Sequence, residues 1–349
     1  MRNKIISEDV ARIASRRIGW DVFSGKTVLV AGASGFLPAY MVEALLELNE
    51  NILARPVTVI ALVRNQQAAE VRFQHHQNNL SLRILQADVA EDFSVDSPID
   101  VIIHAASPAS PKFYGSDPVG TLKANVLGTH RLLELAREKR SAGFLFFSSG
   151  DVYGRGRVGC ELFSEDDYGW LDPTDIRSCY GESKRMAENM CVCWSKQFNV
   201  PAKIVRPFHT YGPGMKLDDG RVFADFVADV VHGRDITMKS DGAAVRAYCY
   251  LSDAVEAFFR VLLDGKVGVP YNIGNEAEQI SVLDLAHLLV SMYPEKSLKV
   301  VQAEHASATG YLPSKISRAC PDTSRARELG WTPEIGLSEG FRRTIASFS

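Results

Sequence analysis

Two residues with the chemistry to move a proton stand four positions apart in this chain, at Tyr180 and Lys184. At that spacing their side chains lie one turn apart on the same face of a helix. A lysine ammonium beside a phenol favours the phenolate, so Lys184 is expected to lower the pKa of Tyr180. A tyrosine tuned in this way exchanges a proton with a hydroxyl or carbonyl group near neutral pH. The pair alone also fits a solvated helix face with one packed tyrosine, so its meaning depends on the surrounding motifs.

A glycine-rich turn near the start of the chain supplies such a motif. Residues 26–31 form an apolar run typical of a buried strand, and residues 39–48 have helical apolar spacing. Gly32 and Gly35 stand between them, in the strand–turn–helix order that a dinucleotide-binding fingerprint requires. Gly32 permits the tight turn, and Gly35 lets backbone N–H groups approach a pyrophosphate. Pro38 replaces the third glycine and is tolerated in a first helical turn. An ordinary turn between strand and helix is the competing interpretation.

Composition narrows the class of protein. The chain has 349 residues, 46% hydrophobic residues and a net charge of −3, which is ordinary for a globular protein. That charge gives no reason to expect a nucleic acid or an acidic membrane surface as a partner. The sequence has no apolar run long enough to span a membrane and no signal-peptide core. The six cysteines lack metal-ligand spacing, so we expect reduced thiols, a cytoplasmic protein and no metal site.

Strands and helices are expected to alternate along the chain. Apolar runs predict strands at 27–31, 57–63, 82–86, 100–104, 143–148, 202–206 and 270–273. Helical spacing predicts helices near 38–49, 117–139, 177–198, 221–232, 252–263 and 281–292, and a further helix within residues 1–22. This alternation predicts an α/β fold, a Rossmann-type doubly wound parallel sheet with helices on both faces.

We expect three segments along the chain. Residues 1–24 form an N-terminal helical extension, and residues 25–206 form the dinucleotide-binding Rossmann domain with the catalytic pair. Residues 207–349 form mostly a smaller C-terminal substrate-binding lobe, interleaved with the end of the sheet. Stretches rich in glycine and proline at 207–221 and 237–248 are expected to be loops of that lobe.

Several further motifs occur in an order that resembles a known family. They are Asp88-Val89, His104-Ala105-Ala106-Ser107, Asn125, Ser148-Ser149, Tyr180 with Lys184, Arg206-Pro207, Tyr211-Gly212-Pro213, Arg246 and residues 250–254. With the glycine-rich turn they resemble the extended short-chain dehydrogenase/reductases of the NAD-dependent nucleotide-sugar epimerase/dehydratase group, over nearly the whole chain. Residues 105–111, 179–180, 218–222 and 273–275 are most similar to UDP-glucuronate decarboxylases (UDP-xylose synthases).

The resemblance implies a role for each of these residues. The implied catalytic residues are Tyr180, Lys184, Ser149 and Asp151. Those implied for NAD are Gly32, Ser34, Gly35, Phe36, Leu37, Arg64, Asp88, Val89, Ala105, Ala106, Ser107, Asn125, Tyr180, Lys184 and Pro207. Those implied for a nucleotide sugar, most of all a UDP-sugar, are Ser107, Ser149, His209, Arg221, Val222 and Arg246.

Three of these roles have competing interpretations. Asp88 is expected to accept a hydrogen bond from the adenine amine, but it also fits a plain helix N-cap. Ser149 is expected to hold the sugar oxygen that is oxidised, but it also fits a buried hydroxyl bonded to the backbone. Arg221 and Arg246 are expected to grip the diphosphate, because a guanidinium matches phosphate oxygens in two places. Arg221 also fits a surface ion pair.

One departure from the family pattern bears on the reaction. Gly150-Asp151 stands where the decarboxylases carry Ser-Glu and the dehydratases carry Asp-Glu. This chain therefore has a single carboxylate at these two positions, Asp151, and its side chain is one methylene shorter than the glutamate of the relatives. This counts against 4,6-dehydration, which needs both a base and an acid, whereas a 4-keto uronate loses CO₂ with its own carbonyl as electron sink. Asp151 capping the turn after its strand is the alternative interpretation.

Two other departures bear on the ligands. Arg64 follows the second strand, where NAD-binding relatives carry an acidic residue for the ribose. Arg64 is placed to meet the 2′-phosphate of NADP, so NADP remains an alternative to NAD. Stacking on adenine or facing solvent is the other interpretation of Arg64. His209 stands where the family has an asparagine that contacts the substrate; it either takes over that contact or is a packed residue.

The expected reaction passes through a transient 4-keto sugar. Tyr180 takes the proton of the sugar 4-OH while a hydride passes from C4 to the nicotinamide; CO₂ is lost, and the hydride and proton return. The alternatives are 4-epimerisation, 4,6-dehydration, NADPH-dependent reduction of a 4-keto sugar, and an NAD(P)-binding sensor without turnover. The resemblance also implies a homodimer through the helices at 117–139 and 177–198. Their apolar residues include Leu122, Val126, Leu132, Leu133, Met186, Met190 and Trp194.

Overall fold

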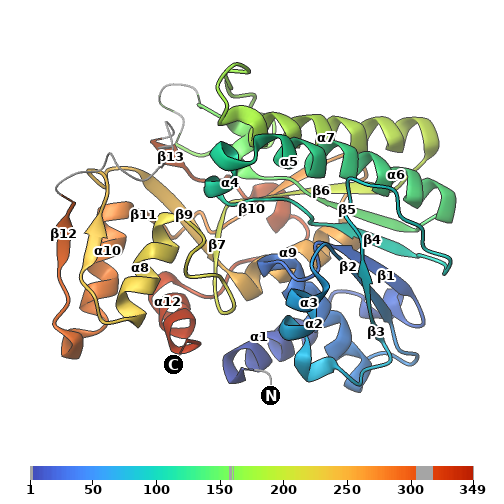
Figure 1. Cartoon of the computed structure of the whole chain (residues 1–349), viewed down its shortest axis with the longest axis horizontal. Helices are drawn as coiled ribbons and strands as arrows, with labels where there is room; N and C mark the ends of the chain where they lie inside the picture. Colours follow the sequence, from blue (N-terminus) through green and yellow to red (C-terminus); the bar gives the residue numbers. More distant parts are fainter. Residues whose placement is uncertain (1–2, 157–158, 160, 304–316, 349) are drawn as a thin grey trace.

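Figure 1 shows a computed structural model of the chain, which describes residues 3–156, 159, 161–303 and 317–348. One of the six cysteines, Cys160, lies outside these residues. The centre of the molecule is a seven-stranded parallel sheet in the order β10-β6-β5-β4-β1-β2-β3. The strands are β1 (Thr27–Ala31), β2 (Thr58–Val63), β3 (Leu82–Gln86), β4 (Val101–His104), β5 (Gly143–Phe147), β6 (Ala202–Pro207) and β10 (Pro270–Ile273). All the strands expected from the sequence are present, and each bound agrees to within one residue.

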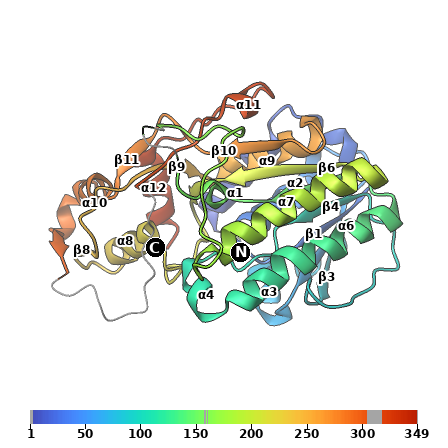
Figure 2. The ribbon, with the colours of Figure 1, turned by 90° about the horizontal axis from the view of Figure 1, so that it is seen from above.

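Helices cover both faces of this sheet because side chains along a strand alternate in direction. Val28 and Val30 of β1 lie in a core shared with α1 (Lys4–Ala14), α2 (Phe36–Asn51) and α9 (Leu251–Asp264). Leu29 and Ala31 lie in the opposite core, with α6 (Gly128–Lys139) and α7 (Ser178–Phe198). Figure 2 shows α6 and α7 side by side on that face. The predicted Rossmann-type, doubly wound fold is confirmed.

The helix expected over residues 117–139 is correct in position but is not one regular helix. It consists of α5 (Pro118–Leu122), a π-helical turn at Lys123–Leu127, and α6. Asn125 lies in the π-helical turn, and its buried side-chain amide donates a hydrogen bond to the Ser183 hydroxyl of α7 at 2.9 Å. Such turns widen a helix locally and are frequent at functional sites. A 3.6-residue apolar pattern does not reveal them.

The residues after 207 form a smaller lobe with its own core. Its sheet contains β7 (His209–Tyr211), β9 (Val245–Tyr250), β11 (Gln279–Ser281) and β13 (Arg318–Ala319), and β8 (Ile236–Met238) pairs with β12 (Val300–Gln302). The helices α8 (Val222–Val231), α10 (Val282–Ser291) and α12 (Leu337–Ala346) contribute to the same core. The helices predicted for this part of the chain are therefore present, and α12 is an addition.

Two details of the smaller lobe correct or support the sequence interpretation. The predicted loops at 207–221 and 237–248 are wrong in part, because β7 and the start of β9 lie within them. β9 was missed because Arg246 interrupts its apolar run, although Arg246 is itself buried. The strand β10 returns to the large sheet beside β6, so the lobe is interleaved with the sheet as expected. The segment boundaries at 24/25 and 206/207 stay predictions.

The N-terminal extension packs on the body of the protein. Its helix α1 lies against α2 and α9 and ends earlier than expected, and a 3₁₀ turn at Trp20–Phe23 follows. The buried Asp9 of α1 accepts hydrogen bonds from the Tyr250 hydroxyl at 2.7 Å and from Arg343 at 2.9 Å. The extension is thereby tied to the smaller lobe. None of the helices in the described part of the chain is both long and apolar enough to cross a membrane.

Candidate active site

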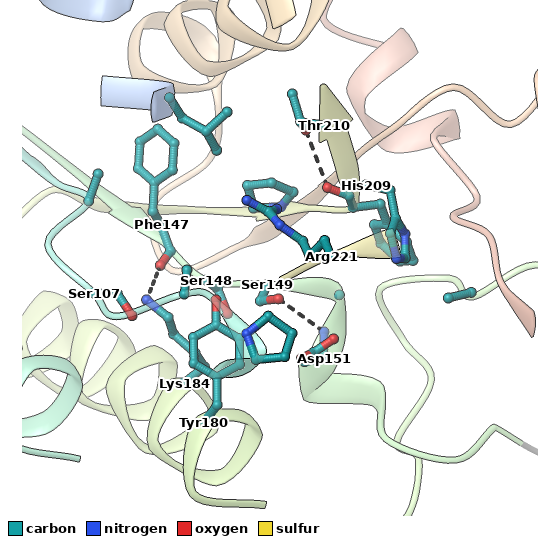
Figure 3. A pocket seen from close by; sticks show the side chains of 18 of the residues that line it. Ser107, Phe147, Ser148, Ser149, Asp151, Tyr180, Lys184, His209, Thr210 and Arg221 are labelled. Atoms are coloured by element: carbon teal, nitrogen blue, oxygen red, sulfur yellow. Dashed lines mark hydrogen bonds between the residues drawn. The ribbon is translucent and has the colours of Figure 1, made fainter. Parts of the chain in front are cut away.

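A cavity of about 260 Å³ lies where the carboxyl ends of the sheet strands meet the smaller lobe. Residues that follow β1, β4, β5 and β6 line it, together with Tyr180 and Lys184 of α7 and with His209 and Arg221 of the smaller lobe (Figure 3). Doubly wound sheets bind ligands at this edge, where the strand order reverses. Here the order reverses between β1 and β4.

The structure brings most of the predicted site residues together around this cavity. The lining contains Gly35, Phe36, Leu37, Ala105, Ser107, Ser149, Asp151, Tyr180, Lys184, Pro207, His209, Arg221 and Arg246. The other predicted residues are not part of the lining: Gly32, Ser34, Arg64, Asp88, Val89, Ala106, Asn125 and Val222. All four predicted catalytic residues thus share one cavity, whereas the residues predicted at the adenine end do not line it.

The glycine-rich turn has the tight geometry that the sequence predicts. Gly32 has a φ of +78°, and a Cβ at this position would lie 2.7 Å from the Ala106 Cα. The amides of Gly32 and Ala33 both donate to the Leu62 carbonyl, at 2.9 and 3.4 Å. Gly35 then begins α2 without a side-chain cap. The turn leaves the N-terminus of α2 at the edge of the cavity, where backbone N–H groups attract an anion.

The residues predicted to hold the adenosine end follow β2 and β3. Arg64 is exposed and lines a shallow depression with Glu70 and Gln86, apart from the active-site cavity. Asp88 accepts a hydrogen bond through Oδ1 from the Ala90 amide at 2.9 Å. This bond closes a local turn and uses one of the two carboxylate oxygens. The helix N-cap alternative for Asp88 is wrong, because no helix lies among the described residues between β3 and β4. The cofactor roles of Arg64 and Asp88 stay predictions.

Tyr180 and Lys184 share a helix face, but their electrostatics differ from the expectation. Both are buried, and Lys184 Nζ donates to the Phe147 carbonyl at 2.7 Å. Burial lowers the pKa of Lys184 to about 7. Burial, followed by the charge of Asp151, raises the pKa of Tyr180, although a hydrogen bond with Ser149 lowers it. Contrary to the expectation, the pKa of Tyr180 is therefore raised overall, because desolvation of the phenolate outweighs the favourable interactions with Ser149 and Arg221.

Several buried polar atoms at this edge of the sheet have no hydrogen-bond partner among the described residues. They are Ser107 Oγ, Ser148 Oγ, His209 Nδ1 and, in the π-helical turn, Asn125 Oδ1. Buried polar groups in proteins are nearly always paired, so these atoms are available to a ligand or to ordered water. Ser107 and Ser148 lie beside the catalytic pair (Figure 3). With the glycine turn, they fit a dinucleotide along the sheet edge and a polar substrate next to it.

Asp151 lies on the 3₁₀ turn that follows β5, among three arginines. Its backbone amide donates to Ser149 Oγ at 3.2 Å, so Ser149 caps this turn. Burial raises the pKa of Asp151, whereas the charges of Arg177, Arg246 and Arg221 lower it. Asp151 is the sole carboxylate among the described residues that line the cavity. The surplus of positive charge suits an anionic substrate.

The smaller lobe holds its polar side chains in place by local contacts. Arg221 precedes α8 and makes a two-point ion pair with Asp219, in which Nη2 lies 2.9 Å from Oδ2. Arg246 is buried in β9, and its Nη1 donates to the Val245 carbonyl at 2.8 Å. Arg221 is thus paired, as one interpretation expected, but it also lines the cavity. Burial lowers the pKa of His209, and Arg246 and Arg221 lower it further, so His209 is a neutral imidazole.

Residues 28–274 match the model of the NAD dependent epimerase/dehydratase family. The chain belongs to this family. It is 34% identical to UDP-glucuronic acid decarboxylase 6 of Arabidopsis thaliana, over 91% of this chain and 87% of that protein. It is 32% identical to UDP-glucuronic acid decarboxylase 1 of Danio rerio, over 93% of this chain and 73% of that protein. The predicted resemblance to this family and to its decarboxylases is confirmed.

Solved structures of the epimerase/dehydratase type share the fold. UDP-glucuronic acid 4-epimerase from Bacillus cereus, solved in complex with UDP-glucuronic acid and NAD, matches with a TM-score of 0.77 at 24% identity, over 92% of this chain and 98% of that one. The dTDP-glucose 4,6-dehydratase from Bacillus anthracis, in complex with NAD, matches with a TM-score of 0.73 at 19% identity, over 93% and 96%. Family membership makes this chain an NAD-dependent enzyme, as the sequence predicted.

Sequence reasoning gave no site role to several side chains that line the cavity of this epimerase/dehydratase, among them Tyr114, Arg177 and Ser148. Tyr114 of α4 (Pro111–Ser116) stacks on Tyr180, with ring centroids 4.8 Å apart. Arg177 stands three residues before Tyr180, and that helical spacing could have found it. Ser148, next to the predicted Ser149, also lines the cavity. Tyr114 had no such signal, because its contact with Tyr180 joins segments that are distant in the sequence.

Proposed function

We propose that this enzyme decarboxylates a UDP-linked uronic acid through a 4-keto sugar while NAD stays bound. The observation that carries the proposal is the cationic cavity around the tyrosine. Arg177, Arg221 and Arg246 surround it, with Asp151 as the one described carboxylate in its lining. A UDP-uronic acid brings a diphosphate and a carboxylate, which such a wall attracts. The similarity to two UDP-glucuronic acid decarboxylases supports the same substrate.

Tyr180 and Ser149 share a hydrogen bond, and we expect the sugar 4-OH to bind beside them. In the proposed reaction Ser149 orients this hydroxyl and Tyr180 takes its proton. When bound, the nicotinamide supplies a positive charge, takes up a hydride from C4 and later gives it back. Lys184 is held in place through the Phe147 carbonyl and is positioned to meet the ribose of the cofactor. The carboxylate of the 4-keto uronate leaves as CO₂, and its bonding electron pair passes into the 4-carbonyl to give an enolate. A proton from water then adds to C5. Once C4 has regained its hydrogen, Tyr180 returns its proton to the oxygen on C4.

The single carboxylate among the described residues of the cavity lining favours decarboxylation over 4,6-dehydration. A 4,6-dehydratase needs a base at C5 and an acid for the departing C6 oxygen, and Asp151 alone does not supply both. Decarboxylation needs no base at C5, because the 4-carbonyl accepts the electron pair of the departing CO₂, and water can supply the proton that C5 then takes up. 4-Epimerisation, net reduction with NADPH and a sensor without turnover are the remaining outcomes that the experiment below distinguishes.

The test is to incubate the purified protein with UDP-glucuronic acid and with other UDP-, dTDP-, CDP- and GDP-sugars, and to identify products by mass spectrometry. Loss of CO₂ from UDP-glucuronic acid supports the proposal. Loss of water, an isomer of unchanged mass, or a gain of two hydrogens identifies dehydration, epimerisation or reduction and overturns it. Tyr180→Phe should lower turnover by about a hundred- to ten-thousand-fold while NAD binding is retained. Tyr168→Phe, at an exposed tyrosine, is the control.

We also propose that the enzyme is a homodimer formed through α5, α6 and α7. Leu132 and Leu133, which we expected at this interface, are fully buried within the subunit. Exposed apolar side chains nevertheless remain on α5, on the π-helical turn and on α7: Val119, Leu122, Leu127, Met186, Val192 and Phe198. Light scattering at micromolar concentration should give the mass of two chains. Met186→Glu should weaken the dimer, whereas Leu80→Glu, at an exposed residue outside the interface, should not. A monomeric wild type, or equally stable dimers of the two variants, would refute this interface.

The cytoplasm is the compartment that we propose for this enzyme. The five cysteines in the described residues are free thiols, among them the exposed Cys193. Free thiols persist where glutathione and thioredoxin keep them reduced. Fractionation of the source cells, with an antibody against the chain, tests the proposal. Recovery outside the cytoplasmic fraction would contradict it.

A further inference from the structure

A second cluster of chemically reactive side chains lies away from the active site. It consists of Glu43 in the middle of α2 and of His75 and His76 in the short 3₁₀ turn Gln74–His76 that follows α3 (Gln66–Arg72). The three ligand atoms lie within 4.8 Å of one another. None of these residues lines the active-site cavity. In Figure 1, α2 and α3 are found near the N-terminus, at the opposite end from the α7 side of the sheet.

The two imidazoles converge on separate oxygens of one carboxylate. His75 Nε2 lies 2.8 Å from Glu43 Oε1, and His76 Nε2 lies 2.9 Å from Glu43 Oε2. The two rings contact each other, with centroids 4.4 Å apart and planes inclined by 45°. Successive residues do not normally direct their side chains at one point, and the tight 3₁₀ turn is what brings both rings to Glu43.

We propose that Glu43, His75 and His76 bind a divalent transition-metal ion, with Zn²⁺ as the ion they suit best. Two imidazoles and one carboxylate are a donor set that Zn²⁺ accepts in tetrahedral geometry, with a fourth position for water. Metal–ligand bonds of about 2.1 Å place neighbouring ligand atoms about 3.4 Å apart. The present 2.8 and 2.9 Å are hydrogen-bond distances to two different oxygens of Glu43, so both imidazoles have to turn away from these bonds when an ion enters between them and the carboxylate.

Burial favours an ion at this position. The Glu43 side chain is 5% exposed, and those of His75 and His76 are 20% and 16% exposed. A carboxylate removed from water to this degree is stabilised by positive charge, and a metal ion would add its charge to that of the nearby Arg72. The cluster opens on a second cavity, of about 840 Å³, which leaves room for the coordinated water.

One positive charge lines the same cavity and has to be considered. Arg72 lies at the cavity and interacts electrostatically with Glu43. Its Nη1 donates to the Gly214 carbonyl of the smaller lobe at 3.2 Å, so the guanidinium is anchored by another group. Arg72 therefore weakens the site for a cation. The expected role of the ion is structural, because it would join α2 to the segment between α3 and β3.

Sequence reasoning predicted no metal site because it examined cysteine spacing. The ligands here come from a helix and from a turn more than thirty residues later, in a pattern that matches no common motif. The pair of adjacent histidines was the available signal. Only the packing of the 3₁₀ turn against α2 adds the third ligand.

Calorimetric titration of the full-length protein with Zn²⁺ tests the proposal. We expect one equivalent to bind with micromolar or tighter affinity and to raise the melting temperature, and a chelator to reverse both effects. Glu43→Gln and His76→Gln should weaken binding at least about tenfold, which corresponds to roughly 1.4 kcal/mol. His287→Gln, at an exposed histidine outside the cluster, should bind as the wild type does. Equal affinity in all these proteins would show adventitious surface binding and overturn the proposal.

A second variant tests the site by a new spectroscopic signal, so that the result does not depend on whether Glu43→Gln or His76→Gln destabilises the protein. His76→Cys replaces one nitrogen ligand by a thiolate, which Zn²⁺ and Co²⁺ also accept. With Co²⁺ as the probe, this variant should bind the metal and show thiolate-to-cobalt charge-transfer absorption that the wild type lacks. A folded His76→Cys protein that takes up Co²⁺ without this absorption would place the metal elsewhere and refute the site.

Discussion

Gly32→Ala should damage both the stability of this enzyme and its hold on NAD. Gly32 has a φ of +78°, a left-handed conformation that costs a residue with a Cβ about 1–2 kcal/mol. The added methyl would also lie 2.7 Å from the Ala106 Cα and 2.8 Å from the Ala106 nitrogen. Both contacts are to backbone, so no side-chain rotation relieves them. Overpacking of this kind costs about 1–3 kcal/mol, which gives a total loss of about 2–5 kcal/mol in the free energy of unfolding.

The turn is also unable to move away without breaking hydrogen bonds. The amides of Gly32 and Ala33 donate to the Leu62 carbonyl, and the Gly35 amide donates to the Gly32 carbonyl at 2.8 Å. Relief of the clash therefore displaces the N–H groups at the start of α2 that are expected to meet the pyrophosphate. We expect NAD affinity to fall at least about tenfold, or roughly 1.4 kcal/mol.

Gly233→Ala is the matched control. Gly233 has a φ of +67°, but a Cβ there would meet nothing within 4 Å. It should lose only the conformational term of about 1–2 kcal/mol and keep the NAD affinity of the wild type. Urea unfolding gives the two stabilities, and calorimetric titration gives the two affinities. If Gly32→Ala matched Gly233→Ala in both measurements, the close approach of Gly32 and Ala106 would not be what the turn requires.

Three further predictions concern charged residues. Burial lowers the pKa of Lys184 from 10.5 in the unfolded chain to about 7 in the folded protein. Between these two pH values the unfolded chain holds the Lys184 proton more firmly than the folded protein does. The free energy of unfolding should therefore rise with pH in this range, by up to about 1.4 kcal/mol per pH unit. Lys184→Met should abolish turnover and flatten this slope in urea unfolding; an unchanged slope would disprove the assignment. Hydrogen bonds from Arg16 and Arg12 lower the pKa of Glu334 from 4.5 to about 2, so the stability they give is present above pH 4.5 and lost as pH falls towards 2. Glu334→Gln should remove this acid-dependent loss, and acid unfolding identical to that of the wild type would contradict the argument. Arg64→Ala should weaken NADP binding but leave NAD affinity within about twofold in calorimetry, whereas weakening of both cofactors would mean that Arg64 stacks on adenine.

The sequence by itself determined the sheet, the glycine turn and the catalytic pair. Each of these depends on local spacing. The seven strands appear as short apolar runs because parallel strands are buried on both faces. Gly32 can be recognised from the sequence because only glycine adopts its backbone conformation without strain. Tyr180 and Lys184 can be recognised as a pair because one helical turn separates them.

Only the tertiary structure decided the electrostatics and the long-range contacts. The pKa of Tyr180 is raised, against the expectation, because burial is set by everything packed around the phenol and not by its helical neighbour. The stacking of Tyr114 on Tyr180 and the convergence of His75 and His76 on Glu43 join segments that are distant in the sequence. The spacing of residues in the sequence does not predict such long-range contacts, because they depend on the lengths of the loops and on how the helices pack on the sheet. Desolvation and proximity, the two effects that decide the chemistry of these groups, therefore arise only when the chain is folded.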